Sequence, residues 1–163
     1  MLANELDSAY NRPQARMWSQ IFLGSFLVLV TTVVHGVATG VALIVLKKAG
    51  RLMHWDKTSQ VQRPFLVGAL VVGLFLVSVL DAVMWAHVYL RVDAFEQLET
   101  ALYFSMVTFT TLGYGDVTLS TDWRLLASFE AANGIIMFGW STALVAAFIQ
   151  RLAPERHGEH PDR

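Results

Sequence analysis

The sequence predicts an all-α membrane protein with three transmembrane helices and one shorter re-entrant helix. The chain is 55% hydrophobic and only 15% charged, whereas an average soluble domain carries about 25% charged residues. Three apolar stretches each exceed the roughly 20 residues that cross a bilayer. A glycine-rich run, TFTTLGYGDV at residues 108–117, lies between the second and the third. A formal net charge of −1 gives no reason to expect a nucleic-acid partner.

The first apolar stretch, residues 21–46, follows an N-terminal tail of residues 1–20. It is longer than the 7–15 apolar residues of a cleaved leader, so we interpret it as a transmembrane helix. Gly36 and Gly40 form a GxxxG pattern, which can seat another helix closely. His35 is expected to hydrogen-bond between helices. The stretch has no arginine, which excludes an ordinary voltage sensor, and we interpret it as a peripheral brace.

Charge in the connections sets the expected orientation. The linker at 47–64 is basic, and the positive-inside rule places it in the cytoplasm. The connection at 91–124 is acidic and belongs outside, so the N-terminal tail is external and the tail at 150–163 is cytoplasmic, in a cell membrane of the bacterial inner-membrane type. Its His157 and His160 are more typical of a solvated tail than of a metal site. The linker's charged residues are Lys47, Lys48, Arg51, Lys57 and Arg63 against Asp56.

The external connection joins the second stretch, residues 65–90, to the third, residues 125–149. Residues 94–109 (AFEQLETALYFSMVTF) predict a short amphipathic helix. About a dozen residues at 1.5 Å each reach only partway across the membrane, roughly 18 Å. The chain must then return as extended backbone, which is tolerated at that depth only where protein buries it or water lines it. Glycine adopts left-handed dihedrals without steric cost. Gly113 and Gly115 therefore predict carbonyls that all point one way, a ligand set for a dehydrated hard cation.

These residues carry a family resemblance. Thr111 to Asp116, TLGYGD, resembles the selectivity filter of potassium channels, usually written TVGYG. The order of helix, pore helix, filter and helix over residues 65–149 is similar to the small bacterial two-helix pore type, here with an extra N-terminal helix. The resemblance implies K⁺ sites at the carbonyls of Thr111, Leu112, Gly113 and Tyr114, within a filter that ends at Gly115. Leu112 stands where valine is common.

The resemblance also implies the assembly and the supporting residues. One strand cannot surround an ion and the chain has one copy of the motif, so a homotetrameric pore is expected in the lipid bilayer. K⁺ would be the permeant ion, with no cofactor. Tyr103 and Asp116 would brace the filter from behind. Gly134 and Gly139 are candidate hinges for opening, although close helix packing explains Gly134 equally well.

Three ionisable residues in the second and third stretches need partners, because such groups are costly in lipid. They are Asp81, His87 and Glu130. One interpretation is structural: Glu130 or Asp81 bonds to pore-helix groups such as Ser105 or Thr108 and supports the filter. The other is a His87–Glu130 contact that titrates near neutrality and makes the channel pH-sensitive. We favour the structural one.

The leading functional hypothesis is a passive, K⁺-selective tetrameric channel, whose acidic mouth, Asp122 included, concentrates cations. A non-selective cation channel and a membrane subunit of a K⁺ uptake system are the alternatives, followed by a non-conducting scaffold. The sequence has no nucleophile–base pair, phosphate loop or metal cluster, so we do not expect an enzyme.

Overall fold

A computed structural model describes residues 2–52 and 62–152. Part of the predicted basic linker, with Asp56 and Lys57, and the end of the predicted cytoplasmic tail, with His157 and His160, lie outside the described residues. Within those ranges every regular element is helical. The four helices are α1 (Leu2–Leu52), α2 (Gln62–Arg91), α3 (Leu98–Phe109) and α4 (Arg124–Leu152).

Three segments are long and apolar enough to cross a membrane: Arg16–Val45, Pro64–Arg91 and Arg124–Arg151. They coincide with the three predicted stretches, so the predicted all-α membrane fold is confirmed. Helix α1 extends beyond residues 21–46 at both ends. Only 17%, 28% and 17% of the most apolar windows of these segments is buried within the chain. Most of their apolar surface is therefore left for lipid or for other protein chains.

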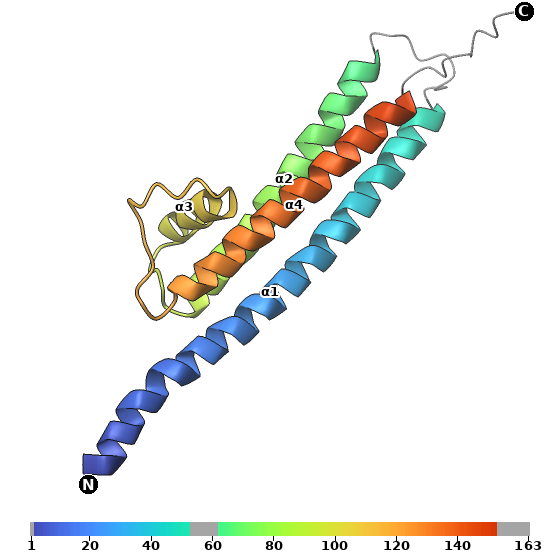
Figure 1. Ribbon diagram of the computed structural model, residues 1–163. Coiled ribbons are helices and arrows are strands. Elements are labelled where there is room, and N and C mark those ends of the chain that lie inside the picture. Colours follow the sequence, from blue (N-terminus) through green and yellow to red (C-terminus); the bar gives the residue numbers. More distant parts are fainter. Residues whose placement is uncertain (1, 53–61, 153–163) are drawn as a thin grey trace, which may run out of the picture.

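The three long helices run side by side, and α3 lies apart from α1, against α2 and α4 (Figure 1). It sits near the end of the bundle where α2 ends and α4 begins. The N-terminal part of α1 extends past that end. The arrangement leaves α3 and the segment that follows it on the opposite side of the bundle from α1.

Aromatic packing fixes α3 against α2. Tyr89 is fully buried and stacks edge-on against Phe104 of α3, with ring centroids 5.3 Å apart. Phe95, in the connection before α3, lies 5.2 Å from Phe104 and 6.1 Å from Tyr89. Such pairs contribute about 0.5–1.5 kcal/mol each beyond their burial. The start of α3 is thus held at a fixed angle to the long helices.

Helix α3 begins at Leu98 rather than at the predicted Ala94. Asp93 has a left-handed φ of 53° and ends the turn after α2, and Gln97 is extended with φ −116° and ψ 135°. Both conformations lie outside the helical region, so the acidic residues before Leu98 cannot join the helix. The helix ends at Phe109 as predicted, and its 12 residues span about 18 Å.

Candidate functional site: the segment after α3

The backbone turns back on the last turn of α3 before it extends. Four successive N–H groups, those of residues 110–113, donate to carbonyl oxygens of residues 106–108 at 2.9–3.3 Å. These carbonyls have no partner further along α3, because the helix ends there. The turn therefore provides hydrogen-bond donors for the last carbonyls of α3. The N–H groups of residues 110–113 are all used in these bonds.

Every second residue of the following segment has a left-handed backbone. The φ angles are 60° at Thr111, 57° at Gly113 and 78° at Gly115. Glycine reaches this region freely, and the sequence predicted it at Gly113 and Gly115. It did not predict it at Thr111, where a β-branched residue is strained by about 1–3 kcal/mol. Such strain clusters at functional sites.

The carbonyl oxygens of Thr111 to Tyr114 accept no backbone hydrogen bond from the parts of the chain that the structure describes. The side chains are also exposed, with 54% of Leu112 and 67% of Tyr114 accessible. Buried or membrane-depth carbonyls need partners. Within the described residues, the carbonyls of this segment therefore have no backbone donor, and two large side chains are exposed.

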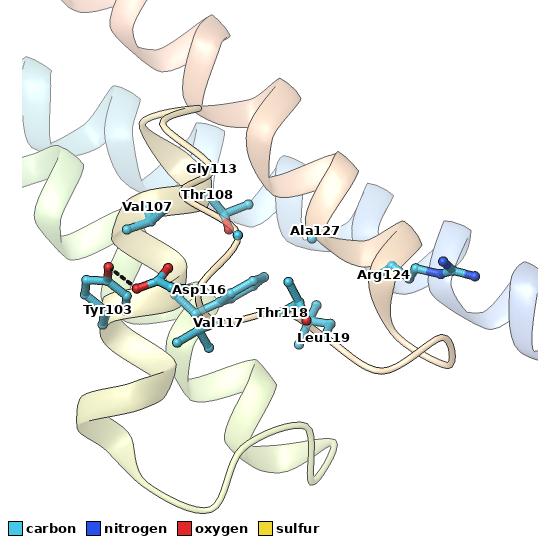
Figure 2. Close-up of a pocket in the computed structure, with 12 residues that line it drawn as sticks. Tyr103, Val107, Thr108, Gly113, Asp116, Val117, Thr118, Leu119, Arg124 and Ala127 are labelled. Carbon is cyan, nitrogen blue, oxygen red and sulfur yellow. Dashed lines mark hydrogen bonds between the residues drawn. The ribbon is translucent and has the colours of Figure 1, made fainter.

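A cavity of about 310 Å³ lies beside this segment, between α3 and the start of α4 (Figure 2). Tyr103 and Asp116 meet at its wall, where the Tyr103 hydroxyl donates to Asp116 Oδ2 at 2.6 Å. This hydrogen bond lowers the pKa of Asp116 and raises the pKa of Tyr103. Asp116 therefore stays ionised at neutral pH while Tyr103 stays protonated. The contact ties the end of the segment to the middle of α3, as the sequence predicted.

Glu130 lies fully buried behind α3. Its Oε2 accepts from the Tyr89 hydroxyl at 2.6 Å, and its Oε1 lies in short contact with Ser105 Oγ, which is also 2.7 Å from the Ala82 carbonyl oxygen. The Ser105 hydroxyl has one proton for two acceptors, and a carbonyl cannot donate. The hydroxyl donates to Glu130 Oε1, to the Ala82 carbonyl oxygen, or to both in a bifurcated bond. The predicted bond between Glu130 and the pore helix is present.

Gly134 marks the closest approach of α4 to α3. A Cβ at this position would lie 1.9 Å from the Phe109 carbonyl oxygen, at the last residue of α3. The structure thus shows the close-packing interpretation of Gly134, and its role as a hinge stays a prediction. At Gly139 no heavy atom lies within 4 Å of such a Cβ.

The structure does not bring His87 to Glu130. His87 is exposed and its Nδ1 lies 2.7 Å from the Val83 carbonyl oxygen, one turn earlier. The sequence places His87 and Glu130 at similar depth, but depth does not fix which side of a helix a residue faces. Tyr89 faces the core and contacts Glu130, and His87, two residues earlier on α2, does not share that face. The contact that would have made His87 sense pH through Glu130 is absent from the described part of the chain.

Asp81 and Asp122 also have partners that the sequence did not identify. Asp81 Oδ2 lies 2.7 Å from His35 Nδ1, with both side chains fully buried, and within the described residues no hydrogen bond joins Asp81 Oδ1 to α3 groups such as Thr108. His35 does hydrogen-bond between helices, as predicted. Asp122 forms an exposed salt bridge with Arg16. The positive charge of Arg16 partly offsets the charge of Asp122, which weakens the attraction for cations that the sequence led us to expect of Asp122.

The GxxxG pattern does not mark the tightest helix contact. No heavy atom lies within 4 Å of a Cβ added at Gly40, and at Gly36 only Trp140 does, at 3.9 Å. Among the α1 glycines, the tightest contact with α4 is at Gly24, where a Cβ would lie 2.6 Å from Phe129 Cγ. The sequence analysis also missed the buried bond from Asn133 Nδ2 to Thr31 Oγ1 at 2.7 Å. The four-residue spacing of Thr31, His35 and Thr39 was the available signal.

Comparison with known proteins agrees with this geometry. Residues 65–151 match the ion channel family. A stretch of 61 residues is 39% identical to the calcium-gated potassium channel TvoK of Thermoplasma volcanium. That stretch covers 37% of this chain and 18% of TvoK, so the chain matches less than a fifth of that relative's length. No solved structure matches the chain.

Proposed function

This chain belongs to the ion channel family, and on that premise we propose that it forms a K⁺-selective channel whose filter is the segment from Thr111 to Gly115. The observation that carries the proposal is the file of unbonded carbonyls at Thr111 to Tyr114. Rings of backbone carbonyls replace the hydration shell of K⁺ in potassium channels. The name of TvoK supports the same ion.

A complete pore requires more than one copy of the chain. One strand offers carbonyls from one side only, so we propose a homotetramer with four strands around a common axis. The exposed Leu112 and Tyr114 side chains would then pack against neighbouring subunits, away from the ion. Their large apolar area is the kind of surface that oligomer interfaces cover.

Conduction would follow from the geometry around the strand. K⁺ would exchange water for the carbonyls of Thr111, Leu112, Gly113 and Tyr114 and advance by repulsion between ions at neighbouring sites. Helix α3 ends where the filter begins, so its negative end favours a cation there. Tyr103, Asp116 and Glu130 would hold the strand against α3. The chain performs no chemistry on the ion, in keeping with a channel rather than an enzyme.

Orientation in the membrane follows from the same proposal. The Arg16–Asp122 bridge places the N-terminal half of α1 at the filter end of the bundle. With the filter facing outward, the N-terminal tail is external and the 47–64 linker is cytoplasmic. The lysines of that linker agree with a cytoplasmic location, because cytoplasmic loops carry an excess of lysine and arginine.

Ion flux into liposomes tests the proposal. Rubidium, a K⁺ analogue, should enter K⁺-loaded liposomes that contain the purified protein, and excess external Na⁺ should not compete. Gly113→Ala should abolish the uptake, because its φ of 57° strains any side chain, whereas Gly68→Ala should not, since no heavy atom lies within 4 Å of its Cβ. Equal uptake by both variants would contradict the proposed filter, and competition by Na⁺ would indicate a non-selective channel.

A further inference from the structure

Helix α1 makes buried polar contacts with α4 on both sides of the α4 glycines. Asn133 Nδ2 donates to Thr31 Oγ1 at 2.7 Å, just before Gly134. Ser141 Oγ lies 3.2 Å from His35 Nε2, just after Gly139. Thr31 and His35 are fully buried and one turn apart on α1. Two adjacent turns of α1 therefore hold the segment of α4 that contains both glycines.

His35 is itself fixed from a third helix. Its Nδ1 lies 2.7 Å from Asp81 Oδ2 of α2, and the carboxylate is fully buried. A ring nitrogen bonded to a carboxylate sets the orientation of the other nitrogen, which here faces Ser141. Trp140 packs edge-on against the same ring, with centroids 6.3 Å apart. His35 is thus a rigid anchor for α4 rather than a mobile side chain.

The outer end of α1 is attached to α4 as well. Gln20 Oε1 accepts from the Leu126 N–H at 3.3 Å, in the first turn of α4. The Arg16–Asp122 bridge lies just above it, and Gly24 against Phe129 lies just below. Helix α1 therefore follows α4 from its first turn to Ser141. This is closer than the peripheral brace that the sequence suggested.

We propose that α1 is a splint that controls gating by holding the Asn133–Ser141 segment of α4 through Thr31 and His35. The proposal rests on the proposed channel function. Helix α1 has no break between Thr31 and His35, so a bend of α4 at Gly134 or Gly139 must lengthen at least one of the two contacts. Thr31 and His35 act through α4 and are positioning residues. Neither residue belongs to the proposed filter.

Single-channel recordings of Ser141→Ala and Thr31→Val test the splint. Each variant removes one hydrogen bond between α1 and α4 and leaves the His35–Asp81 pair intact; Thr31→Val also removes the bonds of that hydroxyl to the Leu27 and Val28 carbonyls. The equilibrium constant between the closed and open states should change about threefold per subunit, the usual effect of an interhelical hydrogen bond in a membrane, and the open probability should shift accordingly. Both variants should change it in the same direction, while unit conductance and reversal potential stay constant. A merely structural role would lower the yield of protein without moving the open probability.

Two matched controls remove hydroxyls whose hydrogen bonds lie within their own helix. Ser78→Ala removes a hydroxyl that bonds the Leu74 carbonyl of its own helix, and Thr32→Val removes one that bonds the Val28 carbonyl. Both should leave the open probability unchanged. Opposite shifts in Ser141→Ala and Thr31→Val, or equal shifts in the controls, would overturn the splint.

A second readout does not depend on current. The chain has no cysteine, so A146C, at an exposed position on α4, provides a single thiol for a water-soluble reagent. Ser141→Ala should change its modification rate about threefold, and Ser78→Ala should not. If that holds while the wild type passes no current, the restraint of α4 by α1 stands but the channel function fails, and its role in gating fails with it. If K⁺ current is present and neither readout changes, the splint fails alone.

Discussion

Replacing Gly134 by alanine should disturb the start of the filter more than any other single methyl addition to α4. The new Cβ would lie 1.9 Å from the Phe109 carbonyl oxygen, about 1 Å closer than real Cβ atoms approach. The obstructing atom is backbone, so no side-chain rotation relieves the clash. Helix α3 or α4 must shift instead.

The structure sets the size of this effect. Overpacking of a fitted core costs about 1–3 kcal/mol and occasionally more. Alanine is favoured over glycine within a helix by about 1 kcal/mol, which offsets part of that cost. Gly139→Ala has the same propensity gain without the clash, because no heavy atom lies within 4 Å. The difference between the two variants should therefore be about 2 kcal/mol or more in favour of Gly139→Ala.

Thermal denaturation of the purified protein in detergent measures this difference. Gly134→Ala should lower the midpoint of the transition, and Gly139→Ala should keep or raise it. Since Phe109 immediately precedes the filter turn, Gly134→Ala should also reduce the K⁺ to Na⁺ permeability ratio. Equal stability and equal selectivity in the two variants would refute the close packing of α4 on α3.

Three further predictions concern the groups around the filter. Tyr103→Phe removes a hydrogen bond to Asp116, so the pKa of Asp116 should rise toward its ordinary value. The lowered pKa means that the bond stabilises the protein above about pH 4 and is lost as pH falls through the lowered value. Current decay during long openings should therefore quicken in this variant at neutral pH, and an unchanged time course would exclude the brace. Glu130→Gln should retain thermal stability, because an amide can donate to Ser105 and accept from Tyr89, whereas Glu130→Leu leaves the Tyr89 hydroxyl unpaired and should cost about 1–3 kcal/mol, with Ser105 keeping its bond to the Ala82 carbonyl oxygen. Glutamine as damaging as leucine would contradict hydrogen bonding at this position as the source of the stability. Asp122→Asn should alter stability by less than about 1 kcal/mol, because the Arg16 bridge is exposed, and it should lower conductance only slightly at low salt; a large, salt-independent loss would contradict this.

The sequence predicted most of the fold because the membrane imposes a simple pattern. Three spans of about 20 apolar residues, and one segment too short and too glycine-rich to be a fourth, allow few arrangements. The glycine spacing also predicted the left-handed backbone at Gly113 and Gly115. The same backbone at Thr111 was not predictable from residue type, because threonine rarely adopts it. It follows from the turn against the end of α3.

Pairings between helices were harder to predict, because depth along a helix does not fix its rotation. Glu130 and His87 lie at similar depth, yet Glu130 faces Ser105 and His87 faces away from the core. Asp81 faces α1, where His35 meets it. Only the packing angles of the long helices decide these partners, and those angles depend on close contacts such as Gly24 against Phe129.

The reversal potential of the wild-type protein in a planar bilayer, with K⁺ on one side and Na⁺ at equal concentration on the other, tests the central claim most directly. A filter of carbonyl rings at Thr111 to Tyr114 predicts a reversal potential strongly displaced toward the K⁺ equilibrium potential. A current that reverses near zero would contradict K⁺ selection by this segment.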